Sequence, residues 1–293
     1  MRILLFLATN LAVLILVGIV MSFFGEPILA ENGVDLNLQG LLIFSAAFGF
    51  IGSFISLFLS KTMAKAAAKV QIITEPANAR ERELLHTVAQ LAENANIKMP
   101  EVGIFPAAQP NAFATGWNKN AALVAVSEGL LQSMRPNEVR AVLAHEIAHV
   151  ANGDMVTLSL IQGVVNTFVI FFSRVIGHIV DRVILKNNRG YGIGYMVSTI
   201  VAQIVLGILA SAIVAWFSRC REYRADAGGA QYADRQSMID ALKSLKRSSE
   251  MANGMPENLQ AFGIGAGKRA GMRALFASHP PLDERIAALQ DAR

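Results

Sequence analysis

The sequence predicts a mainly α-helical, polytopic membrane protein that also contains a small polar domain with both strands and helices. Of its 293 residues, 53% are hydrophobic and only 16% are charged, whereas soluble domains carry nearer a quarter charged residues. Four apolar segments are each long enough to cross a ~30 Å hydrocarbon core. Between the second and third segments, short apolar runs and one amphipathic period indicate an α+β domain.

The first two apolar segments, 3–24 and 38–59, are predicted to form a transmembrane hairpin. A cleaved signal peptide is the alternative for the first, but the apolar core of a signal peptide is normally ~7–15 residues. The loop 25–37 has acidic residues and no Lys or Arg. Three lysines follow the second segment: Lys61, Lys65 and Lys69. The positive-inside rule therefore places the loop outside and the end of the second segment in the cytoplasm.

The other two apolar segments, 155–179 and 195–217, form a second hairpin. Polar Gln162, Asn166 and Thr167 are expected to hydrogen-bond between helices, because such groups are costly in lipid without a partner. The loop between these segments contains basic residues, which would lie outside, against the positive-inside rule, if both segments span. The sequence leaves open whether this hairpin crosses the membrane or lies shallow in it.

These patterns divide the chain into two membrane parts and two polar parts. The predicted domains are an N-terminal hairpin at 1–62, a cytoplasmic polar core at 63–154, the second hairpin at 155–217 and the C-terminal part of the polar domain at 218–293. The predicted strands of a small mixed sheet are 71–74, 101–105 and 121–126, with a weaker edge strand at 111–116 and a helix at 80–95. Two stretches, 251–258 and 263–271, are predicted to be loops.

A second helix of the polar domain carries a clustered set of titratable residues. Pro136 suits the first position of a helix and Gly153 suits its end. The stretch A-V-L-A-H-E-I-A-H-V-A-N-G-D (141–154) places His145 and His149 four residues apart in apolar surroundings. Residues i and i+4 share one helix face, so both imidazoles can bind one ion.

This spacing is the H-E-x-x-H pattern of zinc-dependent peptide hydrolysis. Glu146 lies beside the ion rather than on it, where a carboxylate can take a proton from a water activated by zinc and pass it to the leaving amine. Two ordinary surface histidines are the alternative. The apolar neighbours argue against that alternative, because polar groups in such a setting need partners.

A catalytic zinc takes three protein ligands, so a third ligand must come from elsewhere in the chain. His178 and His279 are candidates, but Glu222, shortly after the fourth apolar segment, is preferred. Asp226 lies four residues later on the same face and can orient a ligating histidine. The two hairpin segments must then return the chain to the same side of the membrane. The metal is expected about 10–20 Å from the bilayer surface at 1.5 Å per residue.

The sequence resembles the HtpX family of bacterial membrane zinc metalloproteases, relatives of the CAAX prenyl endoproteases. The resemblance rests on H-E-I-A-H-V-A-N-G-D-M-V, R-E-Y-R-A-D-A and S-H-P-P-L-D-E-R-I, in that order. It implies a zincin-like α+β metalloprotease domain in a mainly α, polytopic membrane protein. It also implies one zinc ion held by His145, His149 and Glu222, with Glu146 as the general base.

The same resemblance implies further roles. Asp226 would orient a ligand histidine, and His279 would help to hold the oxyanion, although capping of the helix 282–291 is an equal alternative for S-H-P-P. The proposed substrate strand consists of Asn111, Ala112, Phe113, Ala114 and Thr115, to which a substrate would add as a further strand.

The resemblance to this family also implies a cellular location and a class of substrates. It implies a multi-pass protein of the bacterial inner membrane with its active site facing the cytoplasm, acting on membrane-protein or unfolded polypeptide substrates. Envelope quality control beside an ATP-dependent membrane protease and self-cleavage in zinc belong to the same implication.

Three other classes were weighed against an endopeptidase. A structural metal site needs no Glu146 beside the histidines. A transporter should have ionisable groups deep within its spans, and only Arg174, near the end of the third segment, qualifies. An intramembrane protease would place the motif inside a span, whereas charged residues flank it here. The single Cys excludes an internal disulfide, and the scattered basic residues do not indicate nucleic-acid binding.

Overall fold

The computed structural model describes residues 2–31, 33–187, 190–252 and 279–291, and the two predicted loops at 251–258 and 263–271 lie almost wholly outside them. The chain forms two compact units, each assembled from two separate stretches. Unit 1 contains residues 1–56 and 157–214, and unit 2 contains 57–156 and 215–293. Three long helices continue from one unit into the other.

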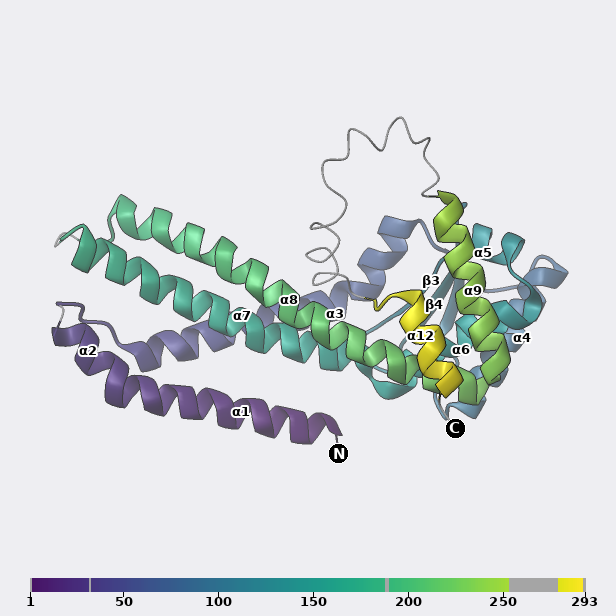
Figure 1. Ribbon diagram of the computed structural model, residues 1–293, viewed down its shortest axis with the longest axis horizontal. Helices are drawn as coiled ribbons and strands as arrows, with labels where there is room; N and C mark the ends of the chain where they lie inside the picture. The colour runs from purple at the N-terminus through teal and green to yellow at the C-terminus, as the bar shows by residue number, and fades with distance from the viewer. Residues whose placement is uncertain (1, 32, 188–189, 253–278, 292–293) are drawn as a thin grey trace. The chain divides into compact units, whose positions relative to one another are not determined.

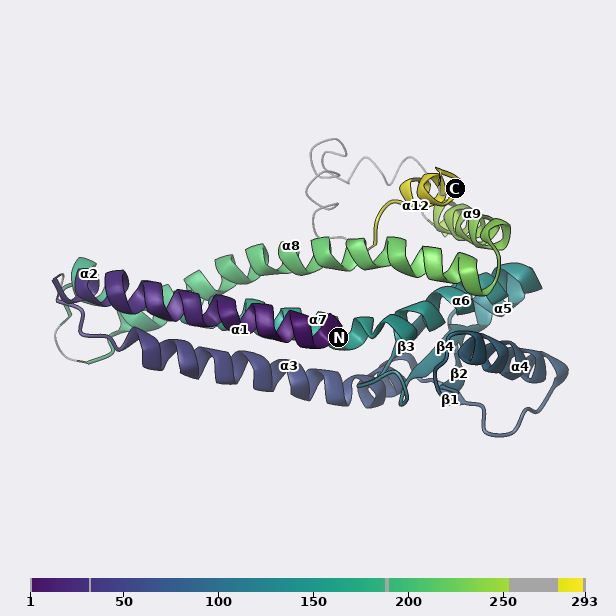
Figure 2. The same ribbon diagram turned by 90° about the horizontal axis from the view of Figure 1, so that it is seen from below.

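Unit 1 is built of long apolar helices (Figures 1 and 2). These are α1 (Arg2–Val20), α3 (Leu38–Ala68), α7 (Asp154–Ile179) and α8 (Ile193–Tyr232), with short π-helical turns η1 (Met21–Gly25) and η2 (Val180–Ile184). Four stretches of the described chain are long and apolar enough to cross a membrane: Leu11–Glu31, Leu38–Ala68, Asp154–Ile184 and Ile193–Tyr232. The fold therefore agrees with the predicted polytopic membrane protein.

Small residues bring the helices of unit 1 close together. A Cβ added at Gly49 of α3 would lie 2.8 Å from the carbonyl oxygen of Gly163 in α7, and Gly177 of α7 meets Thr199 of α8 in the same way. The hydroxyl of Thr167 donates a hydrogen bond to the Gly163 carbonyl within its own helix. Thr167 lies at the contact between α3 and α7, but its hydrogen bond is made within α7 and not between the two helices.

One short element of unit 1 differs from the expectation. Helix α2 (Glu26–Glu31) occupies the stretch that was predicted to be a plain loop. Glu26 lies at its start and accepts the backbone N–H of Leu38 at 2.8 Å, which ties α2 to the first turn of α3. Leu29, Val34 and Phe171 pack into a small apolar cluster there. Burial of these apolar side chains favours a short helix here, although the polar residues of the stretch predict a loop.

Unit 2 contains a four-stranded mixed sheet in the order β1-β2-β4-β3. The strands are β1 (Gln71–Ile72), β2 (Glu101–Phe105), β3 (Ala112–Thr115) and β4 (Leu123–Ser127). β2 and β4 run parallel, while β1 and β3 are antiparallel to their neighbours. The four predicted strands are all present. β3 lies at one edge, so one side of its backbone faces away from the sheet.

Within the described residues of unit 2, five helices that lie wholly in this unit accompany the sheet, and α6 is central among them. They are α4 (Ala79–Asn94), α5 (Glu128–Ser133), α6 (Pro136–Asn152), α9 (Arg235–Ala252) and α12 (Leu282–Asp291). α6 packs against α4, α9, β3 and β4, and α12 packs along α9 (Figure 2). Buried Leu143 and Ile147 of α6 lie in one apolar core with residues of β2, β4, α4, α9 and α12.

Polar contacts fix the ends of these helices. Asn78 accepts the N–H of Glu81 at 2.9 Å at the start of α4, the usual role of an N-cap residue. At the start of α6, the buried Glu138 accepts the N–H of Arg135 at 2.8 Å and the hydroxyl of Ser244 in α9 at 2.8 Å. Glu138 therefore both starts α6 and joins it to α9.

Candidate metal centre

Helix α6 brings two imidazoles to one point. His145 and His149 lie one turn apart, and their Nε2 atoms are 3.2 Å from each other. The rings meet nearly at right angles, at 89°. Immediately after this turn the helix ends at Gly153, whose φ of 69° is left-handed and whose N–H bonds to the carbonyl of His149. Glycine adopts this conformation without steric cost.

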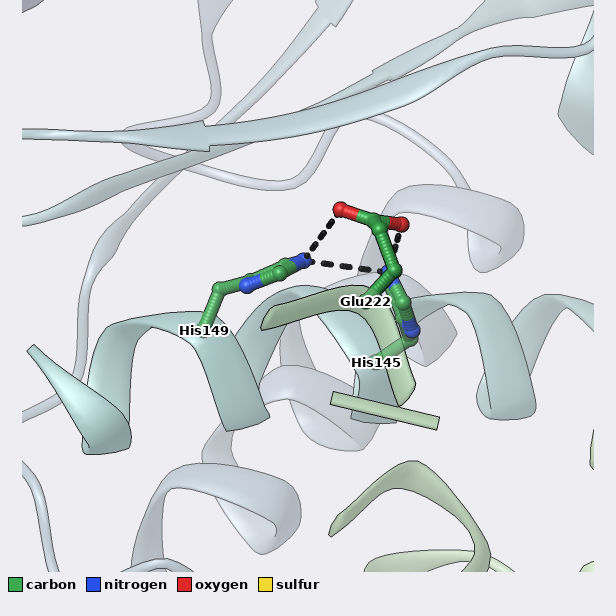
Figure 3. Close-up of side chains that lie close together, drawn as sticks. All are labelled: His145, His149 and Glu222. Atoms are coloured by element: carbon green, nitrogen blue, oxygen red, sulfur yellow. Dashed lines mark hydrogen bonds and ion pairs between the residues drawn. The ribbon is translucent and has the colours of Figure 1, made fainter. Parts of the chain in front are cut away.

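A carboxylate from α8 completes the cluster (Figure 3). Glu222 Oε1 lies 3.3 Å from His149 Nε2, and Glu222 Oε2 lies 3.5 Å from His145 Nε2. One ligand atom from each of the three residues lies within 4.8 Å of the others. Glu222 is 2% exposed and His145 is 6% exposed, so the donors converge in a buried place.

The second nitrogen of each ring rests on an aspartate. His145 Nδ1 lies 2.9 Å from Asp226 Oδ1, and His149 Nδ1 lies 2.7 Å from Asp154 Oδ2. A carboxylate at Nδ1 holds the hydrogen there and leaves the Nε2 lone pair free. Both lone pairs therefore point toward Glu222, in the tautomer that binds a metal.

Arginines hold these aspartates in place. Arg285 of α12 donates from Nε to Asp226 Oδ2 at 2.7 Å and from Nη2 to Asp226 Oδ1 at 2.6 Å, which is the bidentate geometry that Arg favours. Arg221 of α8 donates to the Asp154 backbone carbonyl at 3.1 Å. Each histidine thus has an aspartate behind it, and each aspartate residue is bonded to an arginine.

These contacts alter the acidity of both histidines. Burial alone would lower the pKa of His145, but its hydrogen bonds to Asp226 and Glu222 outweigh burial and raise that pKa. Burial opposes protonation of His149 as well, and the hydrogen bonds to Asp154 and Glu222 raise the pKa of His149 to about 9. A metal that binds here must displace protons, so its apparent affinity falls as the pH is lowered.

The donor set, two imidazoles and a carboxylate, is one that zinc takes in proteins, and ligand atoms about 2.0–2.2 Å from a tetrahedral zinc are roughly 3.3–3.6 Å from one another. The two Nε2 atoms are 3.2 Å apart, and each lies close to a different oxygen of Glu222, His149 Nε2 at 3.3 Å from Oε1 and His145 Nε2 at 3.5 Å from Oε2. Glu222 Oε2 is buried and accepts no well-formed hydrogen bond from the described residues, although His279 Nδ1 lies 2.8 Å away and Arg285 Nη1 forms a 3.3 Å ion pair with it. A buried carboxylate oxygen normally has a well-formed hydrogen bond, and a cation would supply a direct partner.

The remaining predicted site residues also belong to unit 2. Glu146 follows His145 on α6, is half-buried, and its charge acts on both histidines. His279 is largely exposed, with its side chain 63% accessible, and contacts Glu222. The Pro281 carbonyl that follows accepts the N–H groups of Glu284 and Arg285, so this segment both reaches the cluster and begins α12. Residues 112–115 form β3, and Asn111 bonds to Ser127 just before it.

Sequence reasoning missed Asp154 and Arg285. From the sequence, Asp154 is only a charged residue that follows the motif helix, but the left-handed turn at Gly153 returns it to His149. The N-G-D that follows the second histidine is the signal that was available. Arg285 gives no comparable signal, because nothing in D-E-R-I places α12 beside α8.

Comparison with known proteins now identifies the family. Residues 78–293 match the family model described as "Peptidase family M48". A protein called Protease HtpX from Pseudomonas fluorescens is 63% identical over 291 residues, which cover 99% of each chain. The chain belongs to peptidase family M48 and, within it, to the HtpX proteases.

Other relatives agree with this membership. A Protease HtpX from Alcanivorax borkumensis is 62% identical over 295 residues, covering 100% of this chain and 99% of that one. Among solved structures, Ste24p from S. mikatae matches with a TM-score of 0.59 at 19% identity, over 95% of this chain and 67% of that one. At this identity the likeness concerns the fold alone. The protein is therefore an HtpX-family protease with four candidate membrane helices.

Replacing Asp154 tests the contact that sequence reasoning missed. Asp154→Ala should weaken zinc affinity roughly 10–100-fold, because loss of a carboxylate behind a ligating imidazole has effects of this size. Asp154→Asn, which keeps an acceptor oxygen, should weaken it less. Competition with a chromophoric chelator measures the affinity. Asp240→Ala on α9, whose carboxylate accepts a hydrogen bond from Gln236 and not from the cluster, is the control and should change nothing. Unchanged affinity in Asp154→Ala would show that His149 does not depend on this contact.

Proposed function

We propose that the protein is a zinc-dependent endopeptidase of the bacterial inner membrane, with its active site at the cytoplasmic face, which cleaves misfolded or damaged membrane proteins. The observation that carries the chemical part is the convergence of His145 Nε2, His149 Nε2 and Glu222 on one buried point, with a carboxylate behind each imidazole. Membership among the HtpX proteases supports peptide-bond hydrolysis as the reaction.

His145, His149 and Glu222 would hold one zinc ion. When bound, zinc lowers the pKa of a coordinated water and polarises the scissile carbonyl. Glu146 is the neighbouring group suited to accept the proton of the attacking water and to deliver it to the nitrogen of the leaving amine. Asp226 and Asp154 keep both rings in the metal-binding tautomer throughout, because their hydrogen bonds to Nδ1 do not involve the reacting atoms.

His279 is proposed to stabilise the oxyanion that forms on the substrate carbonyl. Its ring contacts Glu222, yet most of the side chain is exposed, so it can turn toward a bound substrate without breaking a packed core. A donor aimed at a developing oxyanion contributes about 10²–10³-fold to the rate.

The free edge of β3 is proposed to bind the substrate backbone. In an antiparallel pair, hydrogen-bonded and non-hydrogen-bonded residue pairs alternate. The N–H of Ser127 bonds to the carbonyl of Asn111, and β3 pairs Ala112 with Val126 and Ala114 with Val124. Ala112 and Ala114 therefore direct their backbone N–H and C=O groups away from β4. A substrate in extended form can pair with these groups as an added strand.

Two features support the location and the substrate class. Lys61, Lys65 and Lys69 follow the apolar run of α3, and the positive-inside rule favours a cytoplasmic position for such a cluster. Helix α6, which bears both histidines, is separated from α7, the third candidate span, by the single residue Gly153. Substrates that are themselves membrane proteins, and the chain's own copies, would reach such a site directly.

Glu146→Gln tests the reaction mechanism. The amide cannot accept a proton, so cleavage of an unfolded polypeptide should fall by about 10²–10⁴-fold while one zinc per chain remains bound. Zinc content is measured on the same purified sample, with Glu93→Gln on α4 as the control. Full activity in Glu146→Gln would refute the proposed base, and an inactive wild type with zinc bound would favour a structural metal site.

His279→Ala tests the oxyanion role. We expect kcat to fall roughly 10²–10³-fold, with KM and zinc content nearly unchanged. A glutamine at the same position retains a donor and should recover part of the rate. Loss of zinc from His279→Ala would instead assign this residue to metal retention, and an unchanged kcat would remove it from the reaction.

Ala114→Pro tests substrate pairing with β3. Proline removes one N–H from the free edge, so KM for an extended peptide should rise several-fold while zinc content stays the same. Ala114→Ser keeps the N–H and serves as the control. Because proline can disturb the strand itself, N-methylation of alternate amides in the peptide provides a second measurement. If neither change raises KM, substrate does not bind as an added strand.

A further inference from the structure

The turn between β3 and β4 displays an aromatic pair at the surface of unit 2. Trp117 is 48% exposed, and its ring centroid lies 6.2 Å from that of Phe58 in α3. Phe58 is 66% exposed. Met99, in the loop before β2, is also exposed at 45%. Large apolar side chains gathered on a surface indicate a region that is not in contact with bulk water.

Phe58 gives this pair a position along a candidate membrane helix. The stretch F-I-S-L-F-L, 54–59, is the last apolar part of α3, and Lys61 is its first charged residue. Such a change from apolar residues to lysine is typical of the point where a helix leaves the hydrocarbon region. Phe58 lies within one turn of this point, and the turn containing Trp117 is in contact with it.

Two lysines lie beside the aromatic pair. Lys119 follows Trp117 in the same turn, and the backbone N–H of Lys98 lies 3.4 Å from Asn120 Oδ1, which joins the two loops. Both lysines are exposed. Neither ammonium group is paired with an acidic side chain in the described part of the chain, whereas Lys61 and Lys65 are both paired with Glu101. The charges of Lys98 and Lys119 therefore remain available to an external anion.

The turn itself has a fixed shape. Gly116 has a φ of 144°, and a Cβ there would lie 2.7 Å from the carbonyl oxygen of Ala121. Asn118 Oδ1 accepts the N–H of Asn120 at 2.7 Å. Because the backbone is held on both sides of it, Trp117 is presented at the surface by the fold rather than by chance rotation of a loose loop.

We propose that the surface formed by Phe58, Lys98, Met99, Trp117 and Lys119, here called the hairpin-tip surface, lies in the headgroup region of the bilayer and binds anionic lipid headgroups. Tryptophan is enriched at this depth because its ring is apolar and its N–H is polar. Each lysine near an anionic membrane surface gains about 1 kcal/mol, which corresponds to roughly fivefold in affinity. The contact with Phe58 favours lipid over a protein partner as the occupant.

A consequence for substrate binding rests on the proposed function. β3 ends at Thr115, two residues before Trp117. An anchored hairpin tip would hold the free edge of β3 at the membrane surface, where it meets polypeptide segments that emerge from the bilayer. Preference for membrane-anchored substrates would then come from the position of β3 and not from recognition of a particular side chain.

Tryptophan fluorescence tests the lipid contact without any need for activity. The sequence has two tryptophans, so Trp216→Phe leaves Trp117 alone in the full-length chain. This variant is placed in vesicles of phosphatidylcholine, with or without phosphatidylglycerol, whose acyl chains are brominated close to the headgroup. We expect the emission of Trp117 to be blue-shifted. The brominated lipids should quench this emission at least about twice as strongly as they quench the emission of a solvent-exposed tryptophan.

A matched control supplies that reference. Arg82→Trp, combined with Trp117→Phe and Trp216→Phe, places a single tryptophan on the exposed start of α4, and aqueous acrylamide should quench it more than bromolipid does. If Trp117 behaves like this control, the inference fails. If Trp117 is shielded from both quenchers, a protein covers the surface and the inference also fails.

Charge reversal tests the lysines. Lys98→Glu with Lys119→Glu should abolish the increase in Trp117 quenching that phosphatidylglycerol causes, and an increase that persists would overturn the anionic part of the inference.

Trp117→Ser should slow cleavage of a membrane-anchored substrate several-fold without affecting cleavage of a soluble unfolded polypeptide. Equal slowing of both would refute the positioning of β3. An inactive wild type with a lipid-quenched Trp117 would instead refute only the proposed function.

Discussion

The pair of contacts between an imidazole and an aspartate, His145 with Asp226 and His149 with Asp154, determines what the buried cluster can be. Without a carboxylate at Nδ1, either ring could rotate or take the other tautomer, and its Nε2 would no longer be committed to the shared point. With both aspartates present, the two Nε2 atoms lie 3.2 Å apart, a separation at which they can share one cation once their protons are displaced. The acidic groups Glu222, Asp226 and Asp154 are each 2% exposed.

Such a concentration of buried carboxylates needs compensating positive charge. Arg285 supplies part of it through two hydrogen bonds to Asp226 and a 3.3 Å ion pair with Glu222. The two imidazoles, whose pKa values are raised, supply positive charge as well, and a divalent cation between them and Glu222 would take the place of their protons. Burying a charge without a partner is expensive, so a cation that bound here would also stabilise the fold of unit 2. The tip of α12 therefore contributes to the site although it provides no metal ligand.

The order of the chain explains how this cluster arises in a membrane protein. Unit 2 is assembled from 57–156 and 215–293, and the apolar stretch between them belongs to unit 1. His145 and His149 precede that stretch, while Glu222 follows it on the last turns of a helix that is continuous from Ile193. The cluster of two histidines and Glu222 is therefore complete only when the second apolar hairpin has formed and returned the chain.

β3 links this cluster to the surface of unit 2. Its inner groups pair with β4, its Ala112 and Ala114 side chains pack on the core that contains α6, and its end leads into the turn with Trp117. A single short edge strand therefore lies between the histidine helix and the hairpin-tip surface. The small, partly buried side chains of Ala112 and Ala114 permit β3 to pack closely on α6, because larger side chains would hold the two elements further apart.

The sequence by itself determined the elements and the chemistry that follow from local periodicity. The lengths of the apolar runs predict the four long helices, and short apolar runs predict the strands. The i, i+4 spacing predicts two imidazoles on one helix face with Glu146 beside them. Glu222 and Asp226 could also be predicted from the sequence, because their i, i+4 spacing likewise places both side chains on one face of another helix. Only the tertiary structure decided that Asp154 and Arg285 complete the cluster and that Trp117 meets Phe58. These are contacts between segments whose separation along the chain carries no periodic signal, so they arise only from packing.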